Sequence, residues 1–441
     1  MKQVTGNFKT AFIAVTSLFF MWGFITVLVD ALIPRLKEVF ELQYYQASLV
    51  QFAWFMAYGL VAIPAGMLLT RIGYKKGIVV GLATAGLGCM LFYPAAELRV
   101  FGLFLTALFV LASGITMLQV AANPYIAVLG PPSGAASRLN LAQAFNSLGT
   151  TIAPMVSAAY LLGDQIMGKD AIAAMDDAQK QAYYASEAES VQMPFLVVAG
   201  FFVLLAVFMA MSHLPKILSG EHKTITEYFK VLRHKRLRFG VLGIFVYVGA
   251  EVAIGSFLTN YFLNLGLAEA VLQNPTMNHL ASSITSVFSG KSIGDLDEKG
   301  VVGAFLIFYW GSAMVGRFVG AWLTSRFNPA HVLRVFALGA IVLVLLSVST
   351  SGFMAMFSIL LVGFFNSIMF PTIFTLSLDG LGEETPEASG VLVTSIVGGA
   401  FIPMAVGVAI DSWNFGIAFF IPVLCYLTIV MFARYASRNK A

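Results

Sequence analysis

The stretch FFMWGFITVLVDALIP, residues 19–34, is almost wholly apolar yet carries one carboxylate, Asp30. A soluble helix would place such an acid on a solvated face, but comparable apolar stretches recur along the whole chain. Each is about 20 residues long, the length that a helix needs to cross a hydrocarbon core of ~30 Å. The sequence therefore predicts an all-α protein that crosses a membrane many times.

Composition supports this interpretation. Of the 441 residues, 59% are hydrophobic and 11% are charged, whereas soluble domains carry roughly 25% charged residues. The first apolar segment is too long for the core of a signal peptide and is not followed by an A-x-A cleavage pattern. We expect it to be retained as the first transmembrane helix.

We expect about twelve transmembrane helices in two six-helix halves. The N-terminal half covers residues 1–215, a basic cytoplasmic linker 216–238, and the C-terminal half 239–441. The expected spans are 9–33, 45–70, 77–95, 100–128, 138–163, 192–213, 239–264, 301–325, 331–349, 353–378, 388–410 and 413–435.

The placement of Lys and Arg residues indicates the orientation, because cytoplasmic loops carry an excess of them. With both termini in the cytoplasm, the basic linker and the loop around Arg71 lie inside, and two acidic loops, after span five and before span eight, lie outside. One expected cytoplasmic loop, DGLGEETPEASG (379–390), is acidic instead. Acidic residues weigh little in this rule, so the orientation is kept.

The two halves resemble each other in sequence. AANPYIAVLG (121–130), with a second proline at Pro154, corresponds to MFPTIFTLSLDGLG (369–382), with a second proline at Pro403. Two parallel repeats of six helices are typical of one large class of secondary transporters, whose substrate site lies between the halves near the midplane.

Specific motifs extend this resemblance. GMLLTRIGYKK, QVAANPYIAVLG, RLNLAQAFNSLG, YVGAEVAIGSFL and GFFNSIMFPTIFTLSLDGLG cover both halves. With them the chain resembles major facilitator superfamily sugar transporters of the fucose/glucose–galactose permease branch. The resemblance implies a bacterial inner-membrane protein that carries a hexose, with Asp30 central to transport and with Gln143 and Asn146 in contact with the sugar.

The chain departs from that family pattern at three positions. Gln119 stands where the fucose symporter type has a second carboxylate, so a proton relay between spans one and four cannot be transferred. Glu251 occupies a position in span seven that is uncharged in that type. Thr70 replaces an aspartate next to Arg71, which questions the charge-relay gating role of this motif.

The residues themselves indicate a polar site within the membrane. Trp22, Thr26 and Asp30 share one helix stripe, a combination that suits a sugar and a cation; alternatively, Asp30 reaches the outer interface at the helix end. Amides present donors and acceptors together, as sugar hydroxyls do. We therefore expect Gln119 and Asn123 of span four, with Gln143 and Asn146 of span five, to bind substrate, or else to bridge helices.

The second half offers its own candidates. Buried charges in a membrane are costly and usually face a cavity or a partner. Glu251, with Tyr247 one turn before it, either contacts the substrate or pairs with Arg317. We expect Arg317 to act as a gating or packing residue beside the close contact at Gly316 and Gly320, and Asn366 to contact the sugar.

These observations predict cation-coupled uptake of a hexose such as glucose or galactose by alternating access. Asp30, with oxygens of Gln119 and Asn123, would bind the coupling ion, and Na⁺ is slightly favoured over H⁺. The alternatives are a proton-coupled symporter of fucose or an N-acetylhexosamine, or an exporter of apolar drugs. We expect no enzymatic activity, no cofactor, no nucleic acid partner and a monomer in the lipid bilayer.

Overall fold

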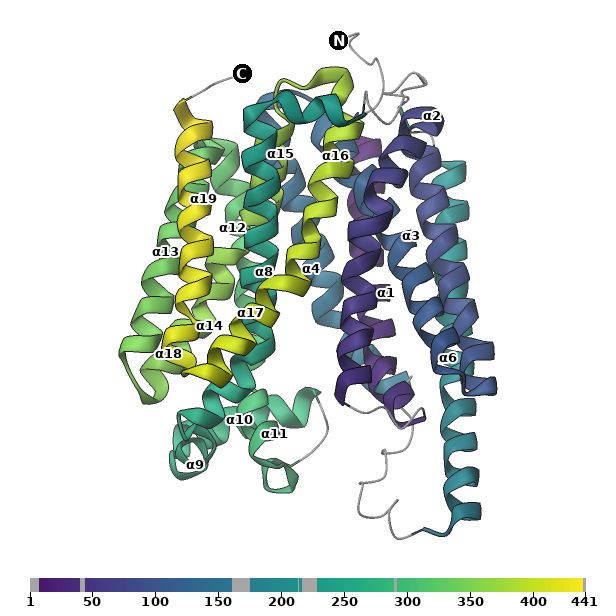
Figure 1. Ribbon diagram of the computed structural model, residues 1–441, viewed down its shortest axis with the longest axis vertical. Coiled ribbons are helices and arrows are strands. Elements are labelled where there is room, and N and C mark those ends of the chain that lie inside the picture. Colours follow the sequence, from purple (N-terminus) through teal and green to yellow (C-terminus); the bar gives the residue numbers. More distant parts are fainter. Residues whose placement is uncertain are drawn as a thin grey trace.

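The computed structural model describes residues 8–39, 44–160, 175–212, 214–215, 228–288 and 292–438. Every regular element in these segments is a helix. Two helical bundles stand side by side, one built from the N-terminal half and one from the C-terminal half (Figure 1). The predicted all-α fold class is therefore confirmed.

In the described residues, the N-terminal bundle contains five long helices. These are α1 (Phe8–Val39), α2 (Tyr44–Leu98), α3 (Phe101–Val128), α4 (Ala135–Tyr160) and α6 (Asp177–Met211), with the short η1 (Pro132–Gly134) before α4. Helix α2 contains two of the expected spans, because its backbone turns sharply at Gly73 (φ 78°, ψ 166°). A positive φ of this size favours glycine.

The C-terminal bundle is interrupted more often. Its helices are α8 (Lys235–Asn264), α12 (Leu306–Arg326), α13 (Pro329–Ser349), α14 (Gly352–Asn366), α15 (Met369–Leu378), α16 (Thr385–Thr394), α17 (Gly398–Ser412), α18 (Phe415–Ala418) and α19 (Phe420–Arg438). The expected tenth span is broken between α14 and α15, and the eleventh by η5 (Ser395–Val397). The short helices α9 (Leu267–Gln273), α10 (Pro275–Phe288) and α11 (Glu298–Gly303) lie at the end of the bundle opposite to the start of α16 (Figure 1).

Length and hydropathy make 10 stretches of the described residues long and apolar enough to cross a membrane. One of them, Phe52–Leu98, contains the bend at Gly73 and so holds two crossings. Helix α4 matches the expected fifth span and ends at Tyr160, the last described residue before a gap. These findings agree with the expected set of about twelve spans.

Part of one predicted loop is helical instead. The acidic segment before span six was expected to be an outer loop, but α6 begins at Asp177, well before the apolar part of the span. Its start carries a capping box: the Asp176 carboxylate accepts from the Gln179 N–H at 2.7 Å, and the Gln179 side chain accepts from the Asp176 N–H at 3.1 Å. This reciprocal pairing satisfies the first donors of the helix and stabilises its extension.

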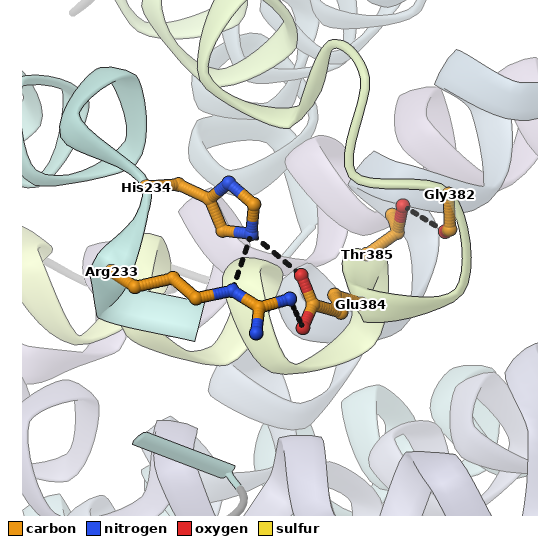
Figure 2. Close-up of polar contacts among 5 residues, drawn as sticks. All are labelled: Arg233, His234, Gly382, Glu384 and Thr385. Atoms are coloured by element: carbon orange, nitrogen blue, oxygen red, sulfur yellow. Dashed lines mark hydrogen bonds and ion pairs between the residues drawn. The ribbon is translucent and has the colours of Figure 1, made fainter. Parts of the chain in front are cut away.

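The last part of the expected linker, 216–238, is helical. Residues 216–227 lie outside the described segments, while η2 (Lys230–Arg233) is a short helix and α8 begins at Lys235 rather than 239. Figure 2 shows how this part is held: Arg233 and His234 contact the Glu384 carboxylate at 3.0 and 2.7 Å. Arg236 adds an ion pair with Asp379 at 3.1 Å. The acidic loop 379–390 therefore serves as the docking site of the basic linker.

We call the end of the molecule that holds η2, the start of α16 and the end of α19 the linker end (Figure 1). The halves meet mainly through α2 with α16 and through α4 with α12 and α15. Several hydrogen bonds cross this boundary. They run from Ser137 to Ala321 (2.8 Å), Asn140 to Thr372 (3.2 Å), Arg317 to Ser147, Thr151 to Met314 (3.4 Å) and Ser389 to Val120 (2.9 Å).

Candidate functional site

Helix α1 carries the first set of predicted residues. Trp22 is buried against Phe19, with ring centroids 5.4 Å apart, and the Thr26 hydroxyl donates to the Trp22 carbonyl at 2.8 Å. Asp30 lies in the same helix, but its side chain is outside the described part of the structure, so its ion-binding role stays a prediction. Among the side chains that are described, no His, Cys, Asp or Glu cluster is arranged to hold a metal ion.

Asn146 connects α4 to α1. Its side-chain amide donates to the Phe19 carbonyl at 2.9 Å, and the backbones approach so closely that a β-carbon at Gly23 would collide with Asn146. Gly149 makes a similar approach to Phe20 one turn further along. Asn146 is partly accessible and lies next to Trp22's helix stripe, so the structure brings two predicted sugar contacts onto adjoining helices.

Asn123 and Gln143 form the second amide pair. The Gln143 amide nitrogen donates to Asn123 Oδ1 at 3.3 Å, which joins α3 to α4. Asn123 is fully buried, and its Nδ2 has no hydrogen-bond partner among the described residues. A buried donor without a partner is costly. Asn123 Nδ2 is therefore available to donate to an acceptor that is not part of the protein.

Gln119 lies one turn before Asn123 on α3 and is partly accessible. Its Nε2 donates to the Tyr58 hydroxyl of α2 at 2.9 Å. Because the nitrogen is the donor in this bond, the amide is oriented with Oε1 away from Tyr58. An oxygen held in this way is suited to accept from a hydroxyl or to ligate a cation.

Glu251 lies near the middle of α8, within the C-terminal half. The charge of Arg317 acts on its carboxylate. The Tyr247 hydroxyl one turn earlier is buried and has no hydrogen-bond partner among the described residues. The direct ion pairs between described residues do not include Glu251 with Arg317. Arg317 instead donates to the Ser367 carbonyl at 3.3 Å and to the Ser147 hydroxyl across the boundary. The simple ion-pair alternative is therefore not what the structure has.

Close helix packing surrounds Arg317. A β-carbon at Gly316 would collide with Phe364 and Ser367, and one at Gly320 would collide with Ile368. These two glycines let α12 lie directly against the break between α14 and α15. The guanidinium thereby reaches the contact between the halves, which is where a gating residue has to lie; the gating role itself stays a prediction.

Two further predicted residues, Asn366 and Arg71, do not lie with the amides of α3 and α4. Asn366 is completely buried inside the C-terminal half, and its amide nitrogen donates to the Tyr309 hydroxyl at 2.9 Å. Tyr309 in turn donates to the Glu251 carbonyl at 3.4 Å. Asn366 thus braces the Glu251 segment through Tyr309. Arg71 is exposed next to the bend of α2, far along the chain from the amides, and the Thr70 hydroxyl donates within its own helix to the Met67 carbonyl.

Sequence reasoning missed several contributors. It gave Tyr58 and Tyr309 no specific role, and it did not single out Ser147 as the partner of Arg317. Hydroxyl side chains in transmembrane helices usually bond to their own backbone, as Thr116 does to Ala112. Only the pairing of distant helices shows which hydroxyls bond elsewhere, so a single sequence carried no signal for them.

The chain matches a known protein family over most of its length. The Major Facilitator Superfamily pattern matches residues 11–402. The chain is 44% identical to the glucose/galactose transporter of Brucella abortus over 98% of this chain and 95% of that protein. It is 35% identical to the L-fucose-proton symporter of Escherichia coli over 97% of this chain and 93% of that protein.

A solved structure has the same architecture. The crystal structure of the major facilitator superfamily transporter FucP in the outward conformation superposes with a TM-score of 0.85 at 34% identity, covering 98% of this chain and 100% of that one. Family pattern, sequence and fold agree over nearly the whole length. This chain is a multi-pass membrane transporter, not an enzyme, and it belongs to the major facilitator superfamily.

Proposed function

We propose that this protein is a cation-coupled sugar symporter that takes up a hexose such as glucose or galactose across a bacterial inner membrane. The observation that carries the proposal is the 44% identity, over nearly the whole chain, to a protein named a glucose/galactose transporter. The related L-fucose-proton symporter supports symport as the mode of transport. Both termini would then be cytoplasmic, and the linker end would face the cytoplasm.

The amide cluster supports a polar, uncharged substrate. Asn123 offers a buried donor without a protein partner in the described residues, Gln143 of α4 donates to its oxygen, and Asn146 follows Gln143 by one helical turn. Because a sugar hydroxyl both donates and accepts, it matches such amides, whereas an apolar drug would leave the buried Asn123 donor without a partner. This chemistry favours a sugar over the exporter alternative.

The coupling ion is proposed to bind at Asp30, with Na⁺ slightly favoured over H⁺. Gln119 supports this choice, because an amide oxygen ligates a cation but does not accept a proton as a second carboxylate would. Asn123 is a weaker ligand than we expected, because its Oδ1 already accepts from Gln143. One charge moved through ~100 mV contributes ~2.3 kcal/mol, enough for roughly fifty-fold accumulation at ~1.4 kcal/mol per tenfold.

The test is uptake of radiolabelled sugars by proteoliposomes of the purified protein, under an imposed Na⁺ gradient and separately under an H⁺ gradient. We expect glucose or galactose to accumulate with Na⁺ and fucose or N-acetylglucosamine to compete weakly. Asp30→Asn should retain exchange of sugar between the two sides and lose accumulation. Accumulation driven only by H⁺, or only of fucose, would favour the proton-coupled alternative, and accumulation by Asp30→Asn would exclude the coupling role.

A further inference from the structure

We propose that Tyr228, two residues before η2, is a gate residue of the transport cycle. It is carried by the C-terminal half, fills the contact between α2 and α16, and holds the linker end closed. The proposal needs only a transporter of two halves that alternate in access. It does not depend on which sugar or ion is carried.

The tyrosine is inserted between two glycines, one from each half. A β-carbon at Gly66 of α2 or at Gly390 of α16 would collide with the Tyr228 hydroxyl. The residue is 1% exposed, although it belongs to a basic segment outside the spans. The backbones of α2 and α16 both lie close to the Tyr228 hydroxyl at these glycines. A larger residue at either position would therefore displace the ring.

The surroundings of the ring cross the boundary between the halves. The Ser389 hydroxyl, beside Gly390, donates to the Val120 carbonyl of α3 at 2.9 Å, and the Ala62 carbonyl of α2 lies close to Gly390. The Tyr228 hydroxyl itself has no hydrogen-bond partner among the described residues. Burial, and then the Glu387 carboxylate, raise the pKa of this phenol. Because the hydroxyl makes no hydrogen bond to the described residues, Tyr228 contributes to the closed contact mainly through the packing of its ring.

Ion pairs decide which half carries the tyrosine. Arg233 and His234 contact Glu384, and Arg236 contacts Asp379, so the segment that follows Tyr228 is fixed to the C-terminal half (Figure 2). When the halves separate at this end, Tyr228 therefore keeps its contact with Gly390 and loses its contact with Gly66 of α2. The gating aspartate of the family pattern is Thr70 here, and the Thr70 hydroxyl donates within its own helix. Tyr228 supplies the contact between the halves that this hydroxyl does not make.

The experiment measures access to the linker end, not sugar uptake. The reporter is Ser389→Cys, at a position that is buried in the closed contact. The purified full-length protein is labelled with a charged maleimide, and the labelling rate at position 389 is followed by mass spectrometry. The native thiols Cys89 and Cys425 are buried and report unfolding in the same sample. Tyr228→Ala should raise the labelling rate at position 389 by about tenfold, equal to ~1.4 kcal/mol of shift toward the open state.

Matched variants separate a gate from general loosening. Phe229→Ala, at an exposed neighbour that touches the same ring, and Tyr228→Phe, which keeps the ring, should leave the rate unchanged. Gly66→Ala should raise it, and adding Gly66→Ala to Tyr228→Ala should add little, since the two act on one contact. An unchanged rate in Tyr228→Ala overturns the proposal, as does a full additive effect in the double variant.

Discussion

Arg317 of α12 donates a hydrogen bond to the Ser147 hydroxyl of α4, so one guanidinium joins the two halves of the transporter. The same guanidinium donates to the Ser367 carbonyl at the break between α14 and α15, and its charge acts on Glu251. This residue therefore couples three features: the boundary between the halves, the interrupted tenth span and the half-buried acid of α8. A change in any one of them alters the surroundings of the other two.

We expect Arg317→Ala to destabilise the protein, because it removes the hydrogen bonds to Ser147 and to the Ser367 carbonyl and also the positive charge that acts on the Glu251 carboxylate. A hydrogen bond that involves a charged group contributes ~1.5–3 kcal/mol, so the free energy of unfolding should fall by a few kcal/mol. The measurement is the midpoint of thermal unfolding in detergent, followed by the intrinsic tryptophan signal.

The double variant Arg317→Ala with Glu251→Gln should recover part of the lost stability, since it removes the carboxylate charge on which Arg317 acts. Ser147→Ala is the matched control, because it deletes only one hydrogen bond and should cost ~1 kcal/mol. If the double variant is no more stable than Arg317→Ala alone, the charges of these two residues do not depend on each other.

A second prediction concerns the amide pair of α3 and α4. Gln143→Ala removes the donor to Asn123 Oδ1 and should raise the KM for the transported sugar by about tenfold, the equivalent of one lost hydrogen bond to a buried group. Concentration-dependent uptake into proteoliposomes measures it. Thr106→Ala, whose hydroxyl donates to its own helix at Gly102 on an exposed face, should leave KM unchanged. Equal KM values for Gln143→Ala and the parent would remove this pair from the sugar site.

A third prediction tests whether Asn366 acts through Tyr309. Tyr309→Phe removes the hydroxyl that accepts from Asn366 and donates to the Glu251 carbonyl. Two buried polar groups then lose a partner, so the free energy of unfolding should fall by about 2 kcal/mol. Denaturant titration in detergent measures this change. Asn366→Ala and Tyr309→Phe should be non-additive in the double variant; full additivity would mean that each residue acts by itself.

Sequence reasoning predicted the spans well because hydrophobic length is a local property. It also pointed to close packing at Gly316 and Gly320, since small residues spaced one turn apart mark helix contacts. The extension of α6 was missed although its signal was present: Asp176 and Gln179 have the spacing of a capping box. The partnership of Arg233 with Glu384, far apart in sequence, had no local signal, and only the fold joins them.

The sequence predicted which residue types form the candidate site, but not which of these residues contact one another. The helices that carry the predicted residues do adjoin one another; these residues are Trp22, Gln119, Gln143 and Asn146. Periodicity gives the face of a helix and not its neighbour. It therefore left open whether an amide bridges helices or faces the substrate, and in the described residues the amides bridge helices while Asn123 keeps one free donor.

The last prediction concerns ion choice at Gln119. Gln119→Glu restores the second carboxylate of the fucose symporter type, at a position where Tyr58 is already within hydrogen-bonding distance. Two acids on facing spans favour proton binding, because two like charges close together resist being ionised at the same time. We expect uptake driven by an imposed H⁺ gradient to increase by about tenfold relative to the parent, and uptake driven by Na⁺ to fall.

Gln119→Asn is the matched control, because it keeps the amide and shortens its reach; it should weaken uptake with both ions and favour neither. Parallel proteoliposome assays with each gradient give the ratio of H⁺-driven to Na⁺-driven uptake for every variant. The ratio is the decisive quantity, since a variant that merely inserts or folds poorly lowers both rates together. A ratio for Gln119→Glu equal to that of the parent would mean that the residue at this position does not select the ion, and that Asp30 alone determines coupling.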